Sequence, residues 1–397
     1  MNYIELNNQV IIRDENGKYQ LNKDKEALKS YLEDYIEPKM KKFDNLNDRL
    51  NYLVENDYYS KEILDLYDQY VIDVIYDFIR AKNFKFQSYM SASKFYQNYA
   101  LKSNDGEEIL ENYEDKVLIV ALTLGNGEPK LAKDIAEKLI NQEFQPATPT
   151  FLNAGRARGG KMVSCFLVNV EDSCEGISYA VSSANHLSKI GGGVALNLTR
   201  LRASGESIKG IKGAAGGVMG VAKLLEQSFS YFNQMGARQG AGAVYLNVLH
   251  PDFETLLDSK KINADEKIRL TTLSIGAIIP DKFMELAEKN EKCYAFYPHS
   301  IYQKYGVHLD GIKMDEWYDK LANDDEIEKK EINPRELLTR IAQTQQESGY
   351  PYVVFIDSAN QQHTLKDVGM IKMSNLCCEI FQYQTPSDIK GYGQVSD

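Results

Sequence analysis

The segment from Asn375 to Glu379 (Asn-Leu-Cys-Cys-Glu) places a thiol, Cys377, two positions after an amide and two positions before a carboxylate. In an extended or finger-like loop, residues two apart project to the same side. Asn375, Cys377 and Glu379 are then expected to converge on one spot, while Leu376 and Cys378 face away. A hydrogen-bonding amide, a sulfur that can lose one electron and a proton acceptor together suit an attack on a hydroxylated carbon. The spacing therefore predicts a redox site in this loop.

The cysteine pattern argues against metal sites and disulfides. No pair among the five cysteines has CxxC spacing, and the five histidines lie apart from them, so no metal site is expected. Cys377 and Cys378 are neighbours, and a disulfide between them would be strained because their side chains point apart. An odd number of cysteines in a long chain does not indicate a disulfide framework, which favours a reducing, cytoplasmic location.

Length and charge narrow the function classes further. The chain has 397 residues and is 43% hydrophobic, which is enough for two or three domains. Its net charge of −11 argues against nucleic acid as a partner, because such partners call for a basic surface. No apolar run approaches the length of a membrane span, and the first five residues lack the features of a signal peptide. We expect neither a membrane nor nucleic acid as a partner.

The first 145 residues or so have the apolar spacing of helices. This spacing is clear over 25–32, 64–79 and 117–124. One exception is the run 10–12, which with the turn residues 14–17 and the run 19–21 predicts a small hairpin.

The pattern changes at Pro146, beyond which most glycines collect and short apolar runs alternate with helices over 174–190 and 217–232. This alternation predicts parallel pairing and an α/β architecture. An acidic stretch, 315–330, is expected to be a solvated excursion. The five expected strands are 163–168, 194–198, 244–248, 273–279 and 351–356.

Three glycine-rich loops are weaker signals. The loop 155–161 matches most of a phosphate-binding loop, but Met162 replaces the magnesium-binding hydroxyl and the segment precedes a strand, so a connection is favoured. The loop 210–217 could cradle a phosphate at a helix start or serve only as a turn. The loop 236–243, with Arg238 and Gln239, is equally compatible with a ligand loop and a simple connection.

Five motifs in order resemble the large (alpha) subunit of ribonucleotide reductase, most closely its class Ib form, and the resemblance spans nearly the whole chain. It implies a ten-stranded α/β barrel of two five-stranded halves, with a finger loop carrying a radical cysteine through the centre. The strands expected here then form the first half-barrel, which ends just after the finger loop at 373–380. The implied domains are a helical N-terminal domain (1–85), a helical region leading into the barrel (86–160) and the first half-barrel (161–397). The motifs are 147–153, 163–167, 191–195, 236–245 and 373–380.

The resemblance assigns catalytic roles to four residues. Cys377 matches the thiyl-radical position, which takes the 3′ hydrogen of the ribose. Glu379 would accept the 3′-hydroxyl proton, Asn375 would orient the substrate hydroxyls, and Cys165 matches one of two thiols that deliver electrons and end as a disulfide. The substrate-binding positions implied by the family are Thr148, Ser164, Gly193, Asn375, Leu376, Cys377, Cys378 and Glu379.

The same resemblance implies an allosteric site for ATP or a deoxynucleoside triphosphate at a homodimer interface built from 174–190 and 217–232. Other implied partners are a nucleoside diphosphate substrate, a thioredoxin- or glutaredoxin-like electron donor and a metal-containing small subunit that supplies the radical, with no cofactor bound directly. The effector-binding positions are Asp172, Arg202, Lys209, Arg238 and Gln239.

The family continues for roughly as long again beyond Asp397, so a separate or spliced C-terminal half is expected to complete the enzyme. Without it, a half-barrel would leave strand edges and an apolar face exposed. Two alternatives stay open. One is a non-catalytic fragment that binds effector and dimerises; the other is a cobalamin-dependent reductase, which shares the finger-loop motif.

Overall fold

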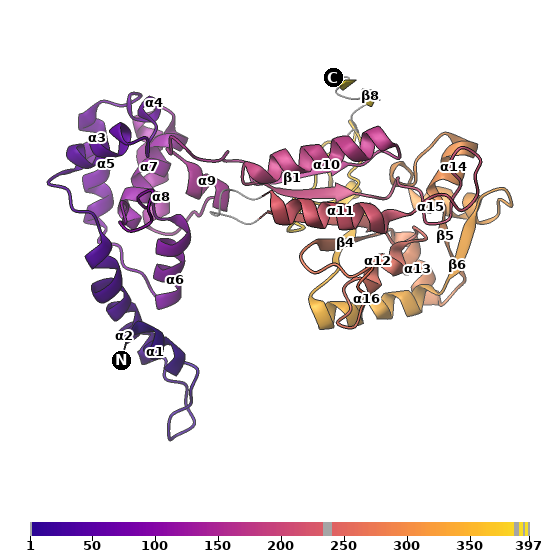
Figure 1. Ribbon diagram of the computed structural model, residues 1–397, viewed down its shortest axis with the longest axis horizontal. Coiled ribbons are helices and arrows are strands. Elements are labelled where there is room, and N and C mark those ends of the chain that lie inside the picture. The colour runs from indigo at the N-terminus through magenta and orange to yellow at the C-terminus, as the bar shows by residue number, and fades with distance from the viewer. Residues whose placement is uncertain (1, 233–239, 385–388, 392–393, 396–397) are drawn as a thin grey trace. The chain divides into compact units, whose positions relative to one another are not determined.

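The computed structural model describes residues 2–232, 240–384, 389–391 and 394–395, which divide into two compact units, Met1–Ser164 and Cys165–Asp397. The first unit is helical and the second is α/β (Figure 1). The α/β class predicted from the sequence, with a helical region followed by parallel strands, is therefore confirmed.

The helical unit is built around α7 (Tyr113–Gly125), whose residues are buried almost throughout. A helix that is apolar on all sides must be covered on all sides, and α5 and α8 pack against it. The helices of this unit are α1 (Tyr3–Gln9), α2 (Asn22–Ser30), the π-helix η1 (Tyr31–Ile36), η2 (Glu37–Lys39), α3 (Leu46–Glu55), α4 (Lys61–Leu64), α5 (Gln69–Ala81), α6 (Tyr89–Lys94), η3 (Phe95–Tyr99), α7, α8 (Pro129–Ile140) and α9 (Thr148–Asn153).

Two local predictions for this unit were wrong. The expected hairpin near residue 10 is reduced to one antiparallel bridge, Arg13 to Tyr19, because residues 10–12 leave α1 as a turn in which the Ile12 N–H donates to the Gln9 carbonyl. The helix expected over 64–79 is interrupted, since α4 ends at Leu64 and α5 begins only at Gln69.

The second unit is organised by a five-stranded sheet in the order β1-β2-β3-β4-β7, in which every neighbouring pair is parallel. The strands are β1 (Cys165–Asn169), β2 (Gly193–Asn197), β3 (Ala241–Asn247), β4 (Ser274–Ile279) and β7 (Tyr352–Phe355). All five coincide with predicted runs. Strands covered on both faces read as nearly continuous apolar segments, which is why the sequence revealed them.

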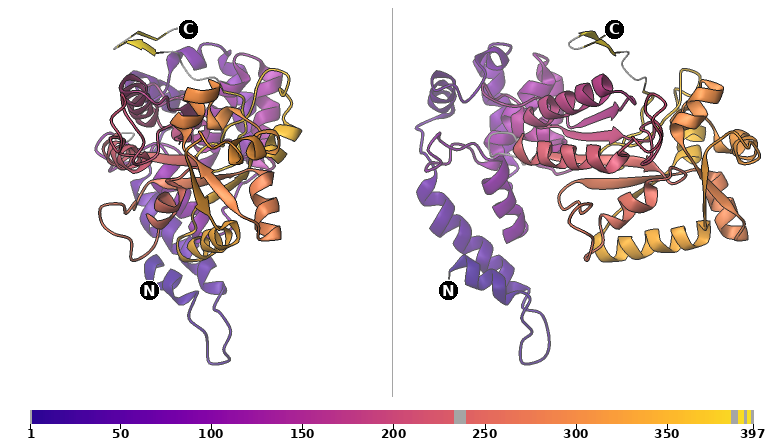
Figure 2. Two further views of the ribbon diagram at one scale, coloured as in Figure 1. Left: turned by 90° about the vertical axis from the view of Figure 1, so that its right-hand side faces the viewer. Right: turned by 45° about the vertical axis from the view of Figure 1, so that its right-hand side comes forward.

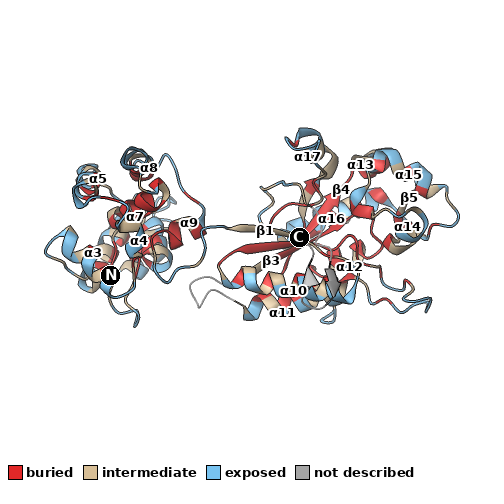
Figure 3. Cartoon of the chain, turned by 90° about the horizontal axis from the view of Figure 1, so that it is seen from above, coloured by how far each residue is buried: buried red, intermediate tan, exposed pale blue. Residues whose placement is uncertain are grey.

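The two faces of the sheet carry different cores. On one face, helices α10 (Cys174–Lys189) and α11 (Val218–Tyr231) lie side by side along the first strands (Figures 1 and 2) and enclose the larger core. The other face carries a small core of Ala195, Ala243, Tyr245, Ile278, Val354 and Met373, against which Ile356 and, further along the chain, Leu376 and Cys378 pack. Figure 3 shows β3 and β4 buried between these layers, whereas α10 and α11 each present an exposed side.

The acidic stretch 315–330, expected to be a solvated excursion, belongs instead to the folded unit. It contains most of α15 (Met314–Ala322) and the start of β6 (Lys329–Ile332), which pairs antiparallel with β5 (Cys293–Phe296). Tyr318, Leu321 and Ile327 are buried in the larger core, so the acidic residues mark only its outer side. The other elements are α12 (Phe253–Asp258), α13 (Asp281–Lys289), α14 (Pro298–Tyr305), η4 (Leu309–Gly311), α16 (Pro334–Ser348), α17 (Ile356–Gln362), β8 (Ile389–Gly391) and β9 (Gln394–Val395).

Candidate functional site

The finger loop, residues 373–380, is closed at its base. An isolated antiparallel bridge pairs Ile371 with Tyr383, and the Tyr383 ring lies where a side chain on Gly369 would stand. A Cβ at Gly369 would come within 1.9 Å of that ring, so glycine lets the two arms of the loop approach. The loop therefore leaves the base as a defined projection over the sheet.

The tip of the finger loop is a tight turn. The Cys378 backbone N–H donates to the Asn375 carbonyl at 3.2 Å, and Cys378 has a left-handed φ of +65°. The Asn375 side-chain oxygen accepts from the N–H groups of Glu379 and Ile380, both at 2.9 Å. The alternation of an extended segment predicted for 375, 377 and 379 was thus wrong in part, because Asn375 is turned inward to hold the turn.

Burial separates the residues of the tip. Asn375 is fully buried, Cys377 and Glu379 are exposed, and Leu376 and Cys378 pack against the small core. The Cys378 thiol also donates to the Val353 carbonyl at 3.6 Å. Cys377 thus sits exposed at the tip with a packed residue on either side.

Cys165 brings the two ends of the site together. As the first residue of β1, it receives a hydrogen bond from Asn375 Nδ2 at 3.1 Å, and its thiol donates to Glu379 Oε1 at 3.9 Å. Gly193 begins β2 and pairs with Cys165 in the register, so the backbone beside the thiol carries no side chain. Asn375 and Glu379 therefore meet the sulfur of Cys165, a third predicted catalytic residue more than 200 positions earlier in the chain.

Tyr245 of β3 supports the finger-loop tip from the sheet. Its hydroxyl donates to the Asn375 carbonyl at 2.7 Å, and its ring is fully buried in β3. The register partner of Tyr245 in β4 is Gly276, where a Cβ would come within 2.2 Å of the ring. Sequence reasoning recognised this segment as a strand and as part of a family motif but gave Tyr245 no role; a tyrosine opposite a glycine becomes a signal only once the register is known.

Two tyrosines lie within electrostatic reach of Cys377. Burial is the main cause that raises the pKa of Tyr245, with smaller contributions from the thiols of Cys378 and Cys377. Burial, followed by Tyr350, raises the pKa of Tyr352, and Cys377 adds to that shift. Both phenols are therefore neutral hydrogen-bonding groups next to the tip.

Two predicted substrate positions belong to the helical unit. Thr148 begins α9, is exposed and hydrogen-bonds Tyr99 between hydroxyl oxygens at 3.2 Å. Ser164 is half-buried and is the last residue of that unit. The substrate roles of both stay predictions.

A second site is a cavity of about 290 Å³ at the carboxyl ends of β1 and β2. Asp172 and Arg202 line it and form an ion pair, Nε to Oδ2 at 2.6 Å. Lys209 is exposed on a tight turn, next to Ile208, which also lines the cavity. Arg238 and Gln239 lie outside the described residues. The other lining residues are Ser173, Cys174, Ile177, Leu201, Ala215, Gly216, Gly217 and Val221.

The described part of the chain has neither metal-binding nor membrane-spanning features. It contains no cluster of three or more His, Cys, Asp or Glu side chains that could hold a metal ion. No helix in these ranges has both the length and the apolar character needed to cross a membrane.

Three family models match the chain in succession. The model described as "Ribonucleotide reductase N-terminal" matches residues 3–84, "Ribonucleotide reductase, all-alpha domain" matches 85–159, and "Ribonucleotide reductase, barrel domain" matches 163–391. The barrel model alone covers more than half of the chain.

Curated relatives agree with these matches. The ribonucleoside-diphosphate reductase subunit alpha of Bacillus subtilis is 50% identical over 395 residues, which are 100% of this chain and 56% of that protein. The subunit alpha of Mycoplasma pneumoniae is 45% identical over 92% of this chain and 50% of its own length. The large chain of Neurospora crassa is 30% identical over 81% of this chain and 34% of its own length. The chain spans about half the length of the bacterial relatives, and it belongs to the ribonucleotide reductase family, in the part of the large, or alpha, subunit that these matches cover.

Proposed function

We propose that this chain takes part in the reduction of ribonucleoside diphosphates to deoxyribonucleotides, with Cys377 as the sulfur radical that attacks the sugar. The observation that carries the proposal is the meeting of Asn375 Nδ2 and Glu379 Oε1 at the sulfur of Cys165, beside the exposed tip that bears Cys377. An oxidisable sulfur, a base and a reducing thiol are the groups that this reaction requires.

The reaction divides among these residues. The Cys377 thiyl radical takes the 3′ hydrogen, so that an S–H bond forms and a C–H bond breaks. Glu379 accepts the 3′-hydroxyl proton, which eases loss of the 2′ hydroxyl. Cys165 and a second thiol become a disulfide and supply two electrons and two protons: one proton leaves with the 2′ hydroxyl as water, and the other ends as the new hydrogen on C2′. Cys377 then returns the hydrogen to C3′ and is again a thiyl radical.

Asn375 and Tyr245 act on this chemistry by holding the finger loop. The Asn375 amide is fully buried and bonds to both the turn and Cys165, so it fixes the height of the tip above the sheet. Substrate contacts are also proposed for Thr148, Ser164, Gly193, Leu376 and Cys378. Gly193 is the position with direct support, because it lies beside Cys165 in the register.

The cavity lined by Asp172 and Arg202 is proposed to bind the allosteric nucleotide, ATP or a deoxynucleoside triphosphate. Its volume of about 290 Å³ lies near the lower end of the range for small-molecule sites. Arg202 supplies a cation at the wall, Lys209 stands at the adjoining turn, and Arg238 and Gln239 complete the proposed set.

The rest of the assembly follows from the same proposal. A metal-containing small subunit supplies the radical, a thioredoxin- or glutaredoxin-like protein supplies electrons, and α10 and α11 form a homodimer interface. We also propose the domain division 1–85, 86–160 and 161–397, which the boundaries of the three family matches support.

The test is reduction of a nucleoside diphosphate by this chain in an assembly with the small subunit and with a polypeptide that supplies the remaining length of the relatives. Cys377→Ser should abolish deoxynucleotide formation while effector binding persists. Cys293→Ala, which removes a buried thiol of β5, is the matched control and should retain activity. Turnover by Cys377→Ser would refute the radical role. Effector binding by a wild-type assembly that never turns over would favour the alternative of a non-catalytic fragment. Activity that needs adenosylcobalamin in place of the small subunit would favour the alternative of a cobalamin-dependent reductase.

A further inference from the structure

Two sets of ion pairs on neighbouring residues lie between the nucleotide cavity and the base of the finger loop, half-buried at the cavity and buried from Arg200 to Asp310. They begin at Glu171 and Asp172, which follow β1, and at Arg200 and Arg202, which follow the neighbouring strand β2. Arg202 pairs with Asp172 at the cavity wall, while Arg200 pairs with Glu171 and turns away from that cavity. Leu201 between them lines the cavity and is buried, so the two arginines share one short and tightly packed segment.

Arg200 leads on to Asp310. Its Nε lies 2.8 Å and 2.9 Å from the two carboxylate oxygens of Asp310, and the side chains are 7% and 1% exposed. A bond of this kind between two buried charges is strong and directional. Asp310 in η4 is therefore fixed in place by the segment that also forms the nucleotide cavity.

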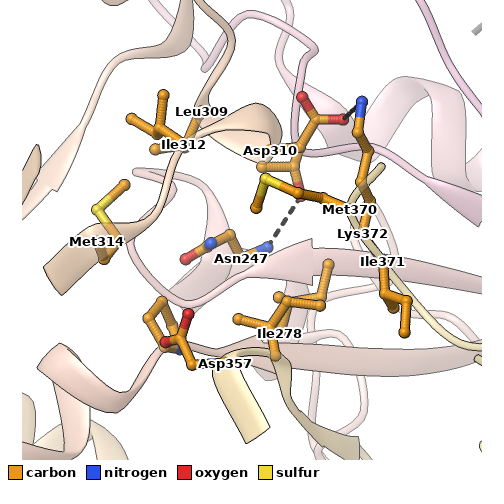
Figure 4. A pocket seen from close by; sticks show the side chains of 13 residues that line it. Asn247, Ile278, Leu309, Asp310, Ile312, Met314, Asp357, Met370, Ile371 and Lys372 are labelled. Carbon is orange, nitrogen blue, oxygen red and sulfur yellow. Dashed lines mark hydrogen bonds and ion pairs between the residues drawn. The ribbon is translucent and has the colours of Figure 1, made fainter. Parts of the chain in front are cut away.

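Asp310 in turn contacts the finger loop. Lys372 Nζ lies 3.6 Å from Asp310 Oδ2, and Lys372 is the residue immediately before the finger loop. Figure 4 shows the Asp310 carboxylate and the Lys372 ammonium joined by this ion pair at the wall of a pocket, with Met370 and Ile371 on the same arm of the loop. Burial lowers the pKa of Lys372, and the Asp310 carboxylate acts in the opposite direction.

These ion pairs offer a path for coupling because a buried charge pair has few alternative arrangements. Removing one partner of such a pair leaves the other charge uncompensated, so movement of Arg200 cannot leave Asp310 and Lys372 unaffected. The distance from Lys372 to the Asn375 turn is only three residues of chain. A change in the cavity wall at Arg202 can therefore reach the tip through the backbone of residues 200–202 and then through the Arg200, Asp310 and Lys372 side chains.

We infer that Lys372 is a positioning residue that, through Asp310 and Arg200, makes the finger loop respond to the occupant of the nucleotide cavity. The inference rests on the proposed function, since it requires that cavity to bind an effector and the loop to bear the reacting sulfur. Lys372 touches neither ligand and acts only through the orientation of the loop.

The test uses hydrogen exchange of the segment 371–383 in the full 397-residue chain, with and without dTTP. In the wild type, dTTP is expected to change exchange rates in this segment by about fivefold or more, the lower end of ordinary allosteric coupling. Lys372→Met should still bind dTTP in a calorimetric titration but should lose this response. Lys372→Arg should restore the response, because it returns a cation opposite Asp310. Lys366→Met should behave as wild type, because Lys366 is exposed and lies five residues before this segment.

The outcomes separate this inference from the proposed function. A wild-type response that survives in Lys372→Met overturns the inference, and so does dTTP binding without any response of the wild-type loop. Absence of dTTP binding to the wild type refutes the proposed effector site itself. If Lys372 had only a structural role, Lys372→Met would lower stability but leave the dTTP-dependent change in hydrogen exchange intact. Circular dichroism melting of the same samples measures that stability.

Discussion

The hydroxyl of Tyr245 donates a 2.7 Å hydrogen bond to the backbone carbonyl of Asn375, so the middle strand of the sheet holds the finger loop directly. Tyr245→Phe removes this donor and leaves a buried carbonyl without it, which should cost about 1 kcal/mol of unfolding free energy. We expect faster alkylation of Cys377 by iodoacetamide, since the tip loses its anchor. Tyr302→Phe, at an exposed tyrosine of α14, should change neither quantity. An unaltered Cys377 alkylation rate in Tyr245→Phe would show that this bond does not hold the loop.

Gly276→Ala should disturb the same support from the neighbouring strand. A Cβ at this position would come within 2.2 Å of the Tyr245 ring, and overpacking of this kind costs about 1–3 kcal/mol. Urea denaturation should show the loss, and the double variant with Tyr245→Leu should recover part of it. Gly220→Ala is the control, because nothing lies within 4 Å of that position in α11 and alanine should favour the helix. If Gly276→Ala lowered the unfolding free energy equally in the wild-type and Tyr245→Leu backgrounds, the clash with the tyrosine ring could not be the cause.

Arg202→Gln should weaken dTTP binding by about tenfold, because it removes the cation that lines the nucleotide cavity. Calorimetric titration measures the affinity directly, independently of turnover. Lys267→Gln, an exposed charge change elsewhere in the same unit, controls for the general electrostatic effect of losing one positive charge. Equal affinities of Arg202→Gln and wild type would place the nucleotide elsewhere.

Lys116 should make stability depend on pH. Burial lowers its pKa to about 7, and its ammonium donates to the Leu152 carbonyl at 3.1 Å with Glu111 at 4.0 Å. An unfolded lysine titrates near 10.4, so between pH 7 and 10 the unfolded chain binds more protons than the folded one. The unfolding free energy should therefore rise with pH, by at most about 1.4 kcal/mol per unit.

The measurement is the difference in unfolding free energy between wild type and Lys116→Met at several pH values. This difference should increase from pH 7 to 10 and stay flat below 7, where both states carry the proton. Lys130→Met, at an exposed position of α8, should give a flat difference throughout. A flat difference for Lys116→Met as well would mean that the buried lysine keeps its proton throughout this range.

The sheet could be predicted from the sequence because buried parallel strands produce apolar runs separated by helical periods. The prediction that the stretch 315–330 is solvated was wrong because it rested on the acidic residues alone. Met314, Tyr318 and Leu321 follow helical spacing and are buried. The turn at the finger-loop tip could not be foreseen, since Cys378 adopts a left-handed φ without being glycine. Local spacing likewise says nothing of Cys165 meeting Asn375; that meeting was expected only from the resemblance.

Tyr245 and Lys372 show the other limit of sequence reasoning. The phenol of Tyr245 and the ammonium of Lys372 act through residues distant in the chain, and neither residue type is unusual in its own segment. Only the register and the packing reveal that both hold the same loop. Positioning residues of this kind can be identified only from the three-dimensional structure. Cys377, the thiol proposed to react, could be singled out from the residue types next to it in the sequence.

Cys165 and Asn375 are separated by 210 residues, with four strands of the sheet formed in between. As the chain leaves the ribosome, its earlier parts fold first, so Cys165 is made long before the loop that will flank it. Until that loop docks, the nascent polypeptide holds an ordinary cysteine with neither amide nor carboxylate beside it. Cys165 thus gains its amide and carboxylate neighbours only after the four intervening strands have been made.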